Sequence, residues 1–239
     1  MKNFSNRYIF IYISVLVLVV AVLLSVAAVS LKPLQKENRE KEKIAQILQA
    51  AGYTDIQGDI LVKYREVAEV INIPQEGSKD SLSLIKIKNQ KDGSYNYVIS
   101  LEGKGLWGPL WGYICIGEDG NTVKGAVFAH KGETPGLGAE IEKPKFANTF
   151  IGKMLFDENG EFVSVKVVKG GVANSTINPI HGVDAISGGT VTSNGVDKML
   201  YNCLSKYVPF FQFLKQEPTA DLDNVNSEIE EVSENNINE

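Results

Sequence analysis

An uncharged apolar run near the N-terminus constrains this chain more than any other feature. Residues 9–31, IFIYISVLVLVVAVLLSVAAVSL, contain no charged side chain over 23 positions. A helix needs about 20 apolar residues to cross the hydrocarbon core of a bilayer. The alternative is a secretory signal peptide cleaved near SVAAVS, but the apolar region of such peptides covers only about 7–15 residues. The run therefore predicts an uncleaved transmembrane helix, preceded by a short cytoplasmic N-terminus at residues 1–8.

The charges that flank this helix give a mixed signal about the side of the membrane on which the rest of the chain lies. Two basic residues precede the helix and five follow it closely, which favours a cytoplasmic position for the C-terminal part. The second group, however, alternates with Glu37, Glu40 and Glu42 as in a charged helix, and long domains are translocated largely regardless of flanking charge. The charges alone do not decide on which side of the membrane the C-terminal part lies.

The C-terminal end is acidic and differs in composition from the rest. Residues 216–239 hold eight acidic residues and no basic one, so the net charge of -5 leaves residues 1–215 positive. This tail is rich in Asn and poor in apolar residues, which predicts a disordered, solvated extension. The chain shows no stripe of basic residues for nucleic-acid binding. The remaining length predicts one main domain behind the anchor.

The segment at residues 32–79 is predicted to be a helical connector. KENREKEKIAQILQAAGY places apolar residues at helical spacing and has Gly52 at the C-cap position. ILVKYREVAEVI, residues 60–71, repeats the helical pattern before Pro74 ends it. We therefore expect two short helices between the anchor and the main domain.

From residue 80 to residue 215 the pattern indicates an α+β domain. Five runs rich in β-branched and aromatic residues are expected to be strands: LSLIKI, YNYVIS, GYICIG, TVKGAVFA and EFVSVKVVK. Between them, KDGS, EDGN and DENGE carry Asp-Gly or Asn-Gly pairs, which are strong hairpin signals. PKFANTFIGKML predicts a short helix and GVDKMLYNCLSKYV a firm one. The sheet is therefore expected to be mostly antiparallel, with flanking helices.

The stretch HGVDAISGGTVTSNGV, residues 181–196, is the candidate site. Thr192 or Ser193 is a natural N-cap for the last helix, which places Thr190 just before the helix N-terminus. Free backbone N–H groups and the helix dipole favour an anion there, and Gly188 and Gly189 allow close approach of the backbone. The residues alone favour a plain Gly-rich capped turn at least as much as a phosphate site.

Other chemistries find less support. A hydrolase nucleophile would read G-x-S-x-G, whereas Ser187 follows DAI. His181 could act as a base for Ser187, but no further acid is spaced to orient it. Cys115 and Cys203 lie in apolar settings without metal-ligand, haem or iron–sulfur spacing. We expect buried thiols, with a disulfide between them as the alternative.

DAISGGTVTSNGV resembles the covalent-flavin motif of the FMN-binding domains in sodium-pumping NADH:quinone oxidoreductases and the related Rnf complexes. In that family a flavin transferase recognises the motif and esterifies its final Thr through the FMN phosphate. The resemblance implies that Asp184 and Ser187 are recognised and that Thr190 carries the flavin. The usual motif has Ala at the position of Gly189, which lacks only the methyl group.

The resemblance extends well beyond this motif. GKGLWGPLWGY, KGETPGLGAEIEKP, IGKMLFDENG and VKGG occur in the order expected for the C-subunit family of the sodium pump. The resemblance covers residues from about 103 to 214, together with the anchor. It implies a single-pass protein of the bacterial inner membrane, in contact with lipid and with the neighbouring proteins of the complex, whose flavin domain faces the periplasm.

As a member of that family, the chain would relay electrons within a complex that oxidises NADH, reduces quinone and moves sodium. It shows no NADH-binding fingerprint of its own. Two alternatives stay open: the corresponding flavin protein of an Rnf complex, and a membrane-tethered binding or assembly module that is never flavinylated.

The resemblance also directs attention to residues for the flavin ring, which needs a slot for its faces and donors for its polar edge. In ETPGLG, the backbone N–H groups of Gly136, Leu137 and Gly138 could face the ring, with a hydroxyl at Thr134 and the Leu137 side chain as a lid. Further candidates are Lys169, which could offset phosphate or flavin charge, and Trp107 and Trp111, which could line the slot. A plain Pro-Gly turn, a solvated Lys, and Trp side chains that pack on the sheet or meet a partner are the simpler interpretations.

Overall fold

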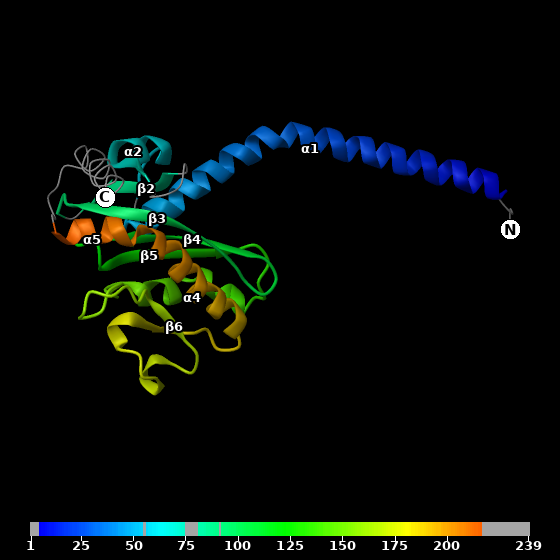
Figure 1. Cartoon of the computed structure of the whole chain (residues 1–239). Coiled ribbons are helices and arrows are strands. Elements are labelled where there is room, and N and C mark those ends of the chain that lie inside the picture. The colour runs from blue at the N-terminus through cyan, green and yellow to red at the C-terminus, as the bar shows by residue number, and fades with distance from the viewer. Residues whose placement is uncertain (1–4, 55, 75–80, 91, 217–239) are drawn as a thin grey trace, which may run out of the picture. The chain divides into compact units, whose positions relative to one another are not determined.

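The computed structural model describes residues 5–54, 56–74, 81–90 and 92–216 (Figure 1). The predicted acidic tail and part of the KDGS turn lie outside these residues. Contacts within the chain divide it into two units, Met1–Lys43 and Ile44–Glu239.

The first unit is the greater part of one long helix, α1 (Asn6–Ala50), which has 45 residues. It is the one helix in the described part of the chain that is long and apolar enough to cross a membrane, and its most apolar stretch is fully exposed in the isolated chain. A helix of this length extends about 70 Å, more than twice the hydrocarbon thickness of a bilayer. The predicted transmembrane segment is thus part of a longer helix, which continues through Pro33 to Ala50, so the first of the two short helices expected after the anchor is not a separate helix. Between Pro33 and the end of α1, Lys41 and Glu37 form an ion pair at 2.7 Å.

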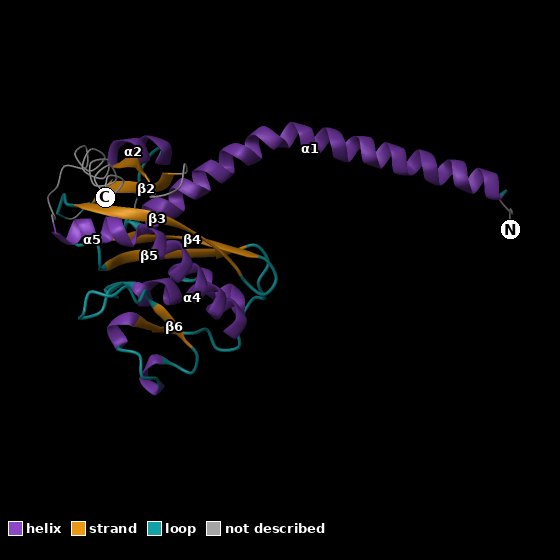
Figure 2. Ribbon diagram, viewed as in Figure 1, coloured by secondary structure: helices purple, strands orange, loops and turns teal. Residues whose placement is uncertain are grey.

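The second unit is built on a five-stranded antiparallel sheet with the strand order β1-β2-β3-β4-β5 (Figure 2). The strands are β1 (Ala68–Pro74), β2 (Ser81–Lys88), β3 (Tyr95–Lys104), β4 (Pro109–Ile116) and β5 (Val123–His130). The four strands predicted between residues 82 and 129 are confirmed, as is their antiparallel pairing, for example Ile99 opposite Ile114. Hairpins follow because the turns between the strands contain the glycines that such turns require.

The helix predicted over residues 60–71 was wrong beyond Val67. The helix α2 (Ile60–Val67) is capped by Asp59 and gives way to β1 at Ala68. In β1, Val70 and Asn72 are exposed whereas Ile71 and Ile73 pack inward, which is the alternation of a strand, and pairing with β2 provides backbone hydrogen bonds on one side. A stretch this short fits helical and strand periods alike, so the pattern alone was ambiguous. The segment boundaries at residues 31, 79 and 215 stay predictions.

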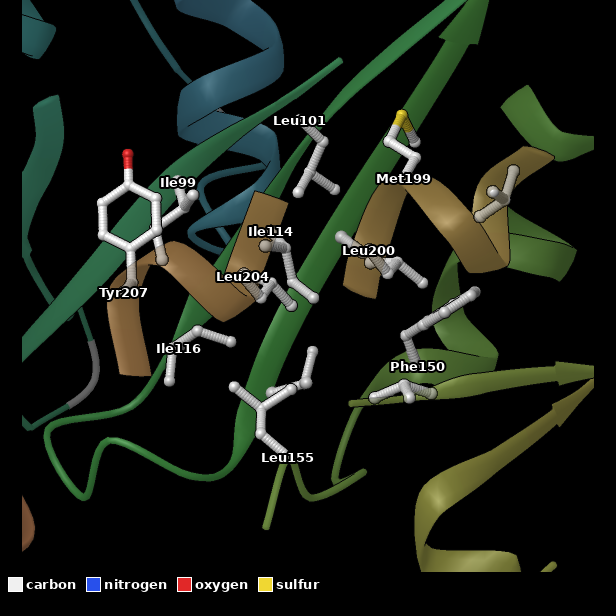
Figure 3. Close-up of a cluster of buried hydrophobic side chains, with 14 of the residues drawn as sticks. Ile99, Leu101, Ile114, Ile116, Phe150, Leu155, Met199, Leu200, Leu204 and Tyr207 are labelled. Carbon is white, nitrogen blue, oxygen red and sulfur yellow. The ribbon is translucent and has the colours of Figure 1, made fainter. Parts of the chain in front are cut away.

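Apolar side chains cover both faces of the sheet. On one face the end of α1 packs through Ile47 and Leu48 against Val98 and Cys115. On the other face lies the larger cluster, to which the final helices α4 (Thr190–Leu204) and α5 (Val208–Gln216) contribute. Figure 3 shows these side chains between α4 and the strands: Ile99, Leu101, Ile114, Ile116, Phe150, Leu155, Met199, Leu200, Leu204 and Tyr207.

The two cysteines belong to different faces of this arrangement. Cys115 is fully buried in the cluster beneath α1, whereas Cys203 borders the cluster beneath α4, and both are free. Burial raises the pKa of the Cys115 thiol to about 12. The expectation of buried thiols is confirmed for Cys115 and was wrong for Cys203, which is only partly buried. Both are free, and the sheet lies between them.

The chain between β5 and α4 is mostly short elements. In order, they are η1 (Gly138–Glu142), α3 (Pro144–Ala147), η2 (Asn148–Phe150), β6 (Lys166–Val168), η3 (Val172–Asn174), η4 (Pro179–His181) and β7 (Gly182–Asp184), and η5 (Ser205–Tyr207) follows α4. The short helix predicted within PKFANTFIGKML is confirmed as α3 and η2.

The strand predicted over residues 161–169 is largely wrong. Only Lys166–Val168 forms a strand, and it pairs in parallel with β7, not in an antiparallel hairpin. Ser164 has a φ of 62°, a left-handed conformation that interrupts a strand. What remains of the expected hairpin is a single bridge between Phe156 and Phe162 around the DENGE turn.

Candidate functional site

Two Gly-rich segments that are far apart in the sequence meet to form a pocket at the start of α4. One segment is the ETPGLG turn after β5, and the other is the GGT segment that precedes and begins α4. The loop between β3 and β4 closes the third side. The lining residues are Leu106, Glu133, Thr134, Leu137, Gly138, Gly188, Gly189, Thr190, Val191 and Thr192.

The local conformation before α4 places Thr190 at the first position of the helix. Gly188 adopts a φ of +75°, which a residue without a side chain reaches most easily, and Gly189 is the N-cap. The predicted N-cap at Thr192 or Ser193 was therefore wrong. Ser193 is buried and accepts a hydrogen bond from the backbone N–H of Ile186 over 3.0 Å, so its hydroxyl fixes the turn from inside the helix.

The ETPGLG turn contributes fewer free donors than its composition suggests. The N–H of Gly136 donates to the Glu140 carboxylate at 3.2 Å, and that of Leu137 donates to the carbonyl of Thr134 at 3.1 Å. Of the three N–H groups expected to face a flavin ring, only that of Gly138 has no hydrogen bond within the described part of the chain. A Cβ added to Gly189 would lie 3.2 Å from this nitrogen, so the two segments nearly touch there.

A buried carboxylate, Glu133, joins the three segments, and its role was not predicted. Only 4% of the residue is exposed. The Thr192 hydroxyl donates to Oε2, and the backbone N–H of Trp107 donates to Oε1 over 2.8 Å. Burial alone would raise the pKa of Glu133, but these bonds, another from the backbone of Gly108 and the nearby His130 together hold that pKa below its usual range. The pocket therefore contains a fixed negative charge.

Several residues predicted from the sequence lie outside the pocket lining. Asp184, Ser187 and Lys169 are not buried, and Asp184 accepts a hydrogen bond from the backbone N–H of Val172. The Trp107 side chain is 69% exposed, although its backbone is held by Glu133. The structure thus brings together Thr134, Leu137, Gly138, Gly188, Gly189 and Thr190, and leaves out Gly136, Lys169, Asp184, Ser187, Trp107 and Trp111.

His181 does not form a catalytic pair with Ser187. Its Nδ1 lies 2.8 Å from the carbonyl oxygen of Met154, a hydrogen bond that ties η4 to the segment after η2. The ring is buried. This geometry gives His181 a structural role.

A family model of an FMN-binding domain matches residues 105–205, a range that includes both segments of the pocket. The C subunit of the Na⁺-translocating NADH-quinone reductase of Pseudomonas aeruginosa is 33% identical over 232 residues, covering 80% of this chain and 88% of that protein. Its counterpart from Neisseria meningitidis serogroup B is 32% identical and covers 83% and 90%. This chain belongs to the C-subunit family of the Na⁺-translocating NADH-quinone reductases.

Solved structures from this family agree with the assignment. The crystal structure of the C subunit from Parabacteroides distasonis has 42% sequence identity and a TM-score of 0.66, covering 76% of this chain and 96% of that one. The structure of NqrC from Shewanella oneidensis has 26% identity and a TM-score of 0.62, covering 75% and 100%. The resemblance inferred from the motifs is confirmed, as is the fold class. Of the two flavin complexes considered, the sodium pump is the one supported.

Proposed function

We propose that this chain is the membrane-anchored electron-relay subunit of a sodium-pumping NADH:quinone oxidoreductase, and that it carries FMN in a phosphodiester bond to Thr190. The observation that carries this proposal is the position of Thr190. It is the first residue of α4, lines the pocket, and follows a glycine pair whose first member has positive φ, inside the region that matches an FMN-binding domain.

The residues around Thr190 fit a phosphate at this point. The first N–H groups of a helix have no partner within the helix, and together with the helix dipole they favour an anion. The first turn of α4 contains no acidic residue. Attachment would form a bond between the Thr190 Oγ and the phosphorus of FMN, which a flavin transferase would deliver as a phosphoanhydride. The anhydride P–O bond would break, and the departing phosphate group and the proton of the Thr190 hydroxyl would be released.

The pocket also fits the flavin ring. Leu106, Leu137 and Val191 provide apolar surface, and Gly138 provides a backbone donor without another hydrogen bond in the described part of the chain. When bound, FMN would accept electrons from one neighbouring protein of the complex and pass them to the next. The chain's contribution is to hold and orient it, since a phosphodiester fixes only the end of the FMN tail.

Intact-mass measurement of the chain, produced together with a flavin transferase, tests the attachment. The unmodified sequence should gain the mass of one FMN less one water, and peptide mapping should place this added mass at Thr190. Thr190→Ala should gain none and should fold normally, whereas Thr190→Ser, which keeps a hydroxyl, should retain part of it. Covalent flavin on Thr190→Ala would refute the assignment.

We also propose that residues 32–239 lie on the periplasmic side and that α1 contacts lipid. The family assignment and the exposed apolar surface of α1 support this proposal, against the count of flanking charges. Protease added to intact spheroplasts should digest the domain. A cytoplasmic protein in the same sample should survive, and full protection of the domain would show that the charge count was the better guide.

A further inference from the structure

Glu133 is a buried charge in the pocket that the attachment of FMN does not require. In the described part of the chain, no other carboxylate is buried to this degree. Burial of an unpaired charge is so unfavourable that an isolated carboxylate in such a place would be protonated or replaced by an apolar residue. The geometry around Glu133 must therefore favour its charged form.

The surroundings of Glu133 match a carboxylate, with one hydrogen-bond donor for each oxygen and two glycines beside them. Oε1 receives the N–H of Trp107 at 2.8 Å and Oε2 receives the Thr192 hydroxyl, so each oxygen is bound to a different segment. A Cβ added to Gly105 would lie 2.5 Å from Oε1, and one added to Gly138 would lie 2.7 Å from Oε2. The two glycines thus leave the space that the carboxylate occupies.

We propose that Glu133 is a positioning residue that ties the three walls of the pocket together and places a fixed negative charge beside the bound flavin, which lowers the midpoint potential of that flavin. The inference rests on the proposed function. Reduction adds electrons to the ring, and an anion held beside the ring opposes this addition. An electron arriving from a neighbouring redox protein is therefore held less tightly and is passed on more readily.

Other ionisable groups lie around Glu133, and an experiment must distinguish their effects on the potential from the effect of Glu133. At the end of β5, His130 accepts the N–H of Glu133 at its Nδ1 over 3.1 Å, and its Nε2 lies 3.5 Å from Glu142 of η1. Glu140 of η1 accepts the N–H of Gly136. Lys104 at the end of β3 is exposed, and the first turn of α4 has no acidic residue. The carboxylate bound to Thr192 is that of Glu133 alone, so a Thr192 variant addresses it selectively.

The test is a spectroscopic redox titration of the full chain with attached FMN, in detergent. Glu133→Gln removes the charge and keeps the shape, because an amide can accept from Trp107 and donate to Thr192. Its midpoint potential should shift upward. The matched control is Glu158→Gln, which removes the same charge from an exposed turn outside the pocket and should leave the potential unchanged. Equal potentials for Glu133→Gln and the unmodified chain, or equal shifts in both variants, overturn the inference.

A second pair of variants covers the case in which Glu133→Gln does not fold. Thr192→Val deletes one donor to the carboxylate at nearly constant volume, which should raise the pKa of Glu133. The change of slope that protonation of Glu133 causes in a plot of midpoint potential against pH should therefore move to higher pH, and Thr192→Ser should return it to its original position. An unmoved change of slope in Thr192→Val overturns the inference. Intact mass is recorded first: no FMN on the unmodified chain overturns the proposed function as well, whereas FMN present with unaltered potentials overturns this inference alone.

Discussion

Asp184 and Val172 are joined by a hydrogen bond in which the backbone N–H of Val172 donates to Asp184 Oδ1 over 2.7 Å. The bond directs the aspartate of the flavin motif toward η3 and the Gly170–Gly171 turn, both of whose glycines have positive φ. Asp184 is not among the residues that line the pocket. We therefore expect Asp184 to act in the motif through its negative charge or its hydrogen bond to Val172, and not by contact with the flavin ring.

Two substitutions at Asp184 separate these contributions. Asp184→Asn keeps an acceptor for Val172 and removes the charge, whereas Asp184→Ala removes both. If a transferase reads the charge, both variants should lose covalent FMN. Only Asp184→Ala should also unfold at a lower temperature, because it leaves the Val172 N–H without its acceptor. Ultraviolet fluorescence of the denatured protein band measures the attached flavin. Normal attachment in Asp184→Asn would show that the charge is not required and that the hydrogen bond from the Val172 N–H is sufficient.

The glycines of the ETPGLG turn should respond differently to substitution. A Cβ on Gly136 would meet no atom within 4 Å, and its φ of +75° makes the expected penalty one of backbone strain, about 1 kcal/mol. A Cβ on Gly138 would collide with the Thr192 hydroxyl and the Glu133 carboxylate. Gly138→Val should therefore alter the visible spectrum of attached FMN, whereas Gly136→Val should lower stability and leave the spectrum nearly unchanged.

Absorption spectra and denaturant titrations of the two flavinylated variants check this contrast. Attachment itself should survive in both, because Thr190 lies in the other segment of the pocket. A normal spectrum in Gly138→Val would mean that the turn does not hold the ring. Trp107 and Lys169 would then be the next residues to replace.

Glu133 should also make the stability of the fold depend on pH. Because its pKa is lowered in the folded state, its charge stabilises the fold above its ordinary pKa of 4.5, and this stabilisation is lost as the pH falls through the lower folded value. The difference in unfolding free energy between the unmodified chain and Glu133→Gln should be constant near neutral pH and should shrink below about pH 4.5. Urea titrations at several pH values measure it. A difference that grows toward acid pH would contradict the lowered pKa.

Ser164 offers a stabilising substitution away from the pocket. It is fully buried, has a φ of 62°, and its hydroxyl finds no hydrogen-bond partner within the described residues. Burial of an unsatisfied hydroxyl costs about 1–3 kcal/mol, so Ser164→Ala should stabilise the domain by roughly 1 kcal/mol. Ser164→Gly also relieves the backbone strain of the positive φ, but it raises the conformational entropy of the unfolded chain, which lowers stability. Denaturant midpoints rank the variants, and a destabilised Ser164→Ala would indicate a partner for the hydroxyl.

The cysteines should differ in reactivity. Burial raises the pKa of Cys115 to about 12, so almost no thiolate exists there at neutral pH. Alkylation of the native chain should modify Cys203 at most, and Cys115 should react only after unfolding. Mass spectrometry of peptides gives the sites. A disulfide between the two after mild oxidation would be incompatible with their places on opposite faces of the sheet.

Much of the sheet could be predicted because its signals are local. Strands β2 to β5 are marked by β-branched runs and by the Gly-containing turns between them. The start of α4 was placed too late, since two capping residues, Thr192 and Ser193, suggested a helix N-terminus while their hydroxyls in fact bind Glu133 and the backbone of Ile186. Side chains that favour caps can equally serve tertiary contacts, and sequence does not separate the two uses.

The pocket could be predicted only in part, for a related reason. Thr190 and its glycines form a contiguous motif, but Glu133 acquires its role from partners 26 and 59 residues away in the chain. No local pattern marks such a residue. An acid placed just before a Pro-Gly turn was the one available signal, and a solvated surface acid would give the same signal. Likewise, no local pattern marks the left-handed φ of Ser164 or the parallel pairing of β6 with β7 that follows it.

The rim of the pocket has a consequence for the protein outside its complex. Leu106, Leu137 and Val191 of its lining are 54%, 42% and 53% exposed, and the neighbouring Trp107, outside the lining, is 69% exposed. A flavin attached to Thr190 would have one edge beside these side chains and open to water, where dissolved dioxygen can reach it. Active sites exclude solvent partly to prevent such side reactions. The free protein, once reduced, would then pass its electrons to dioxygen and form superoxide or hydrogen peroxide. Burial of these four side chains against a neighbouring protein would prevent this side reaction.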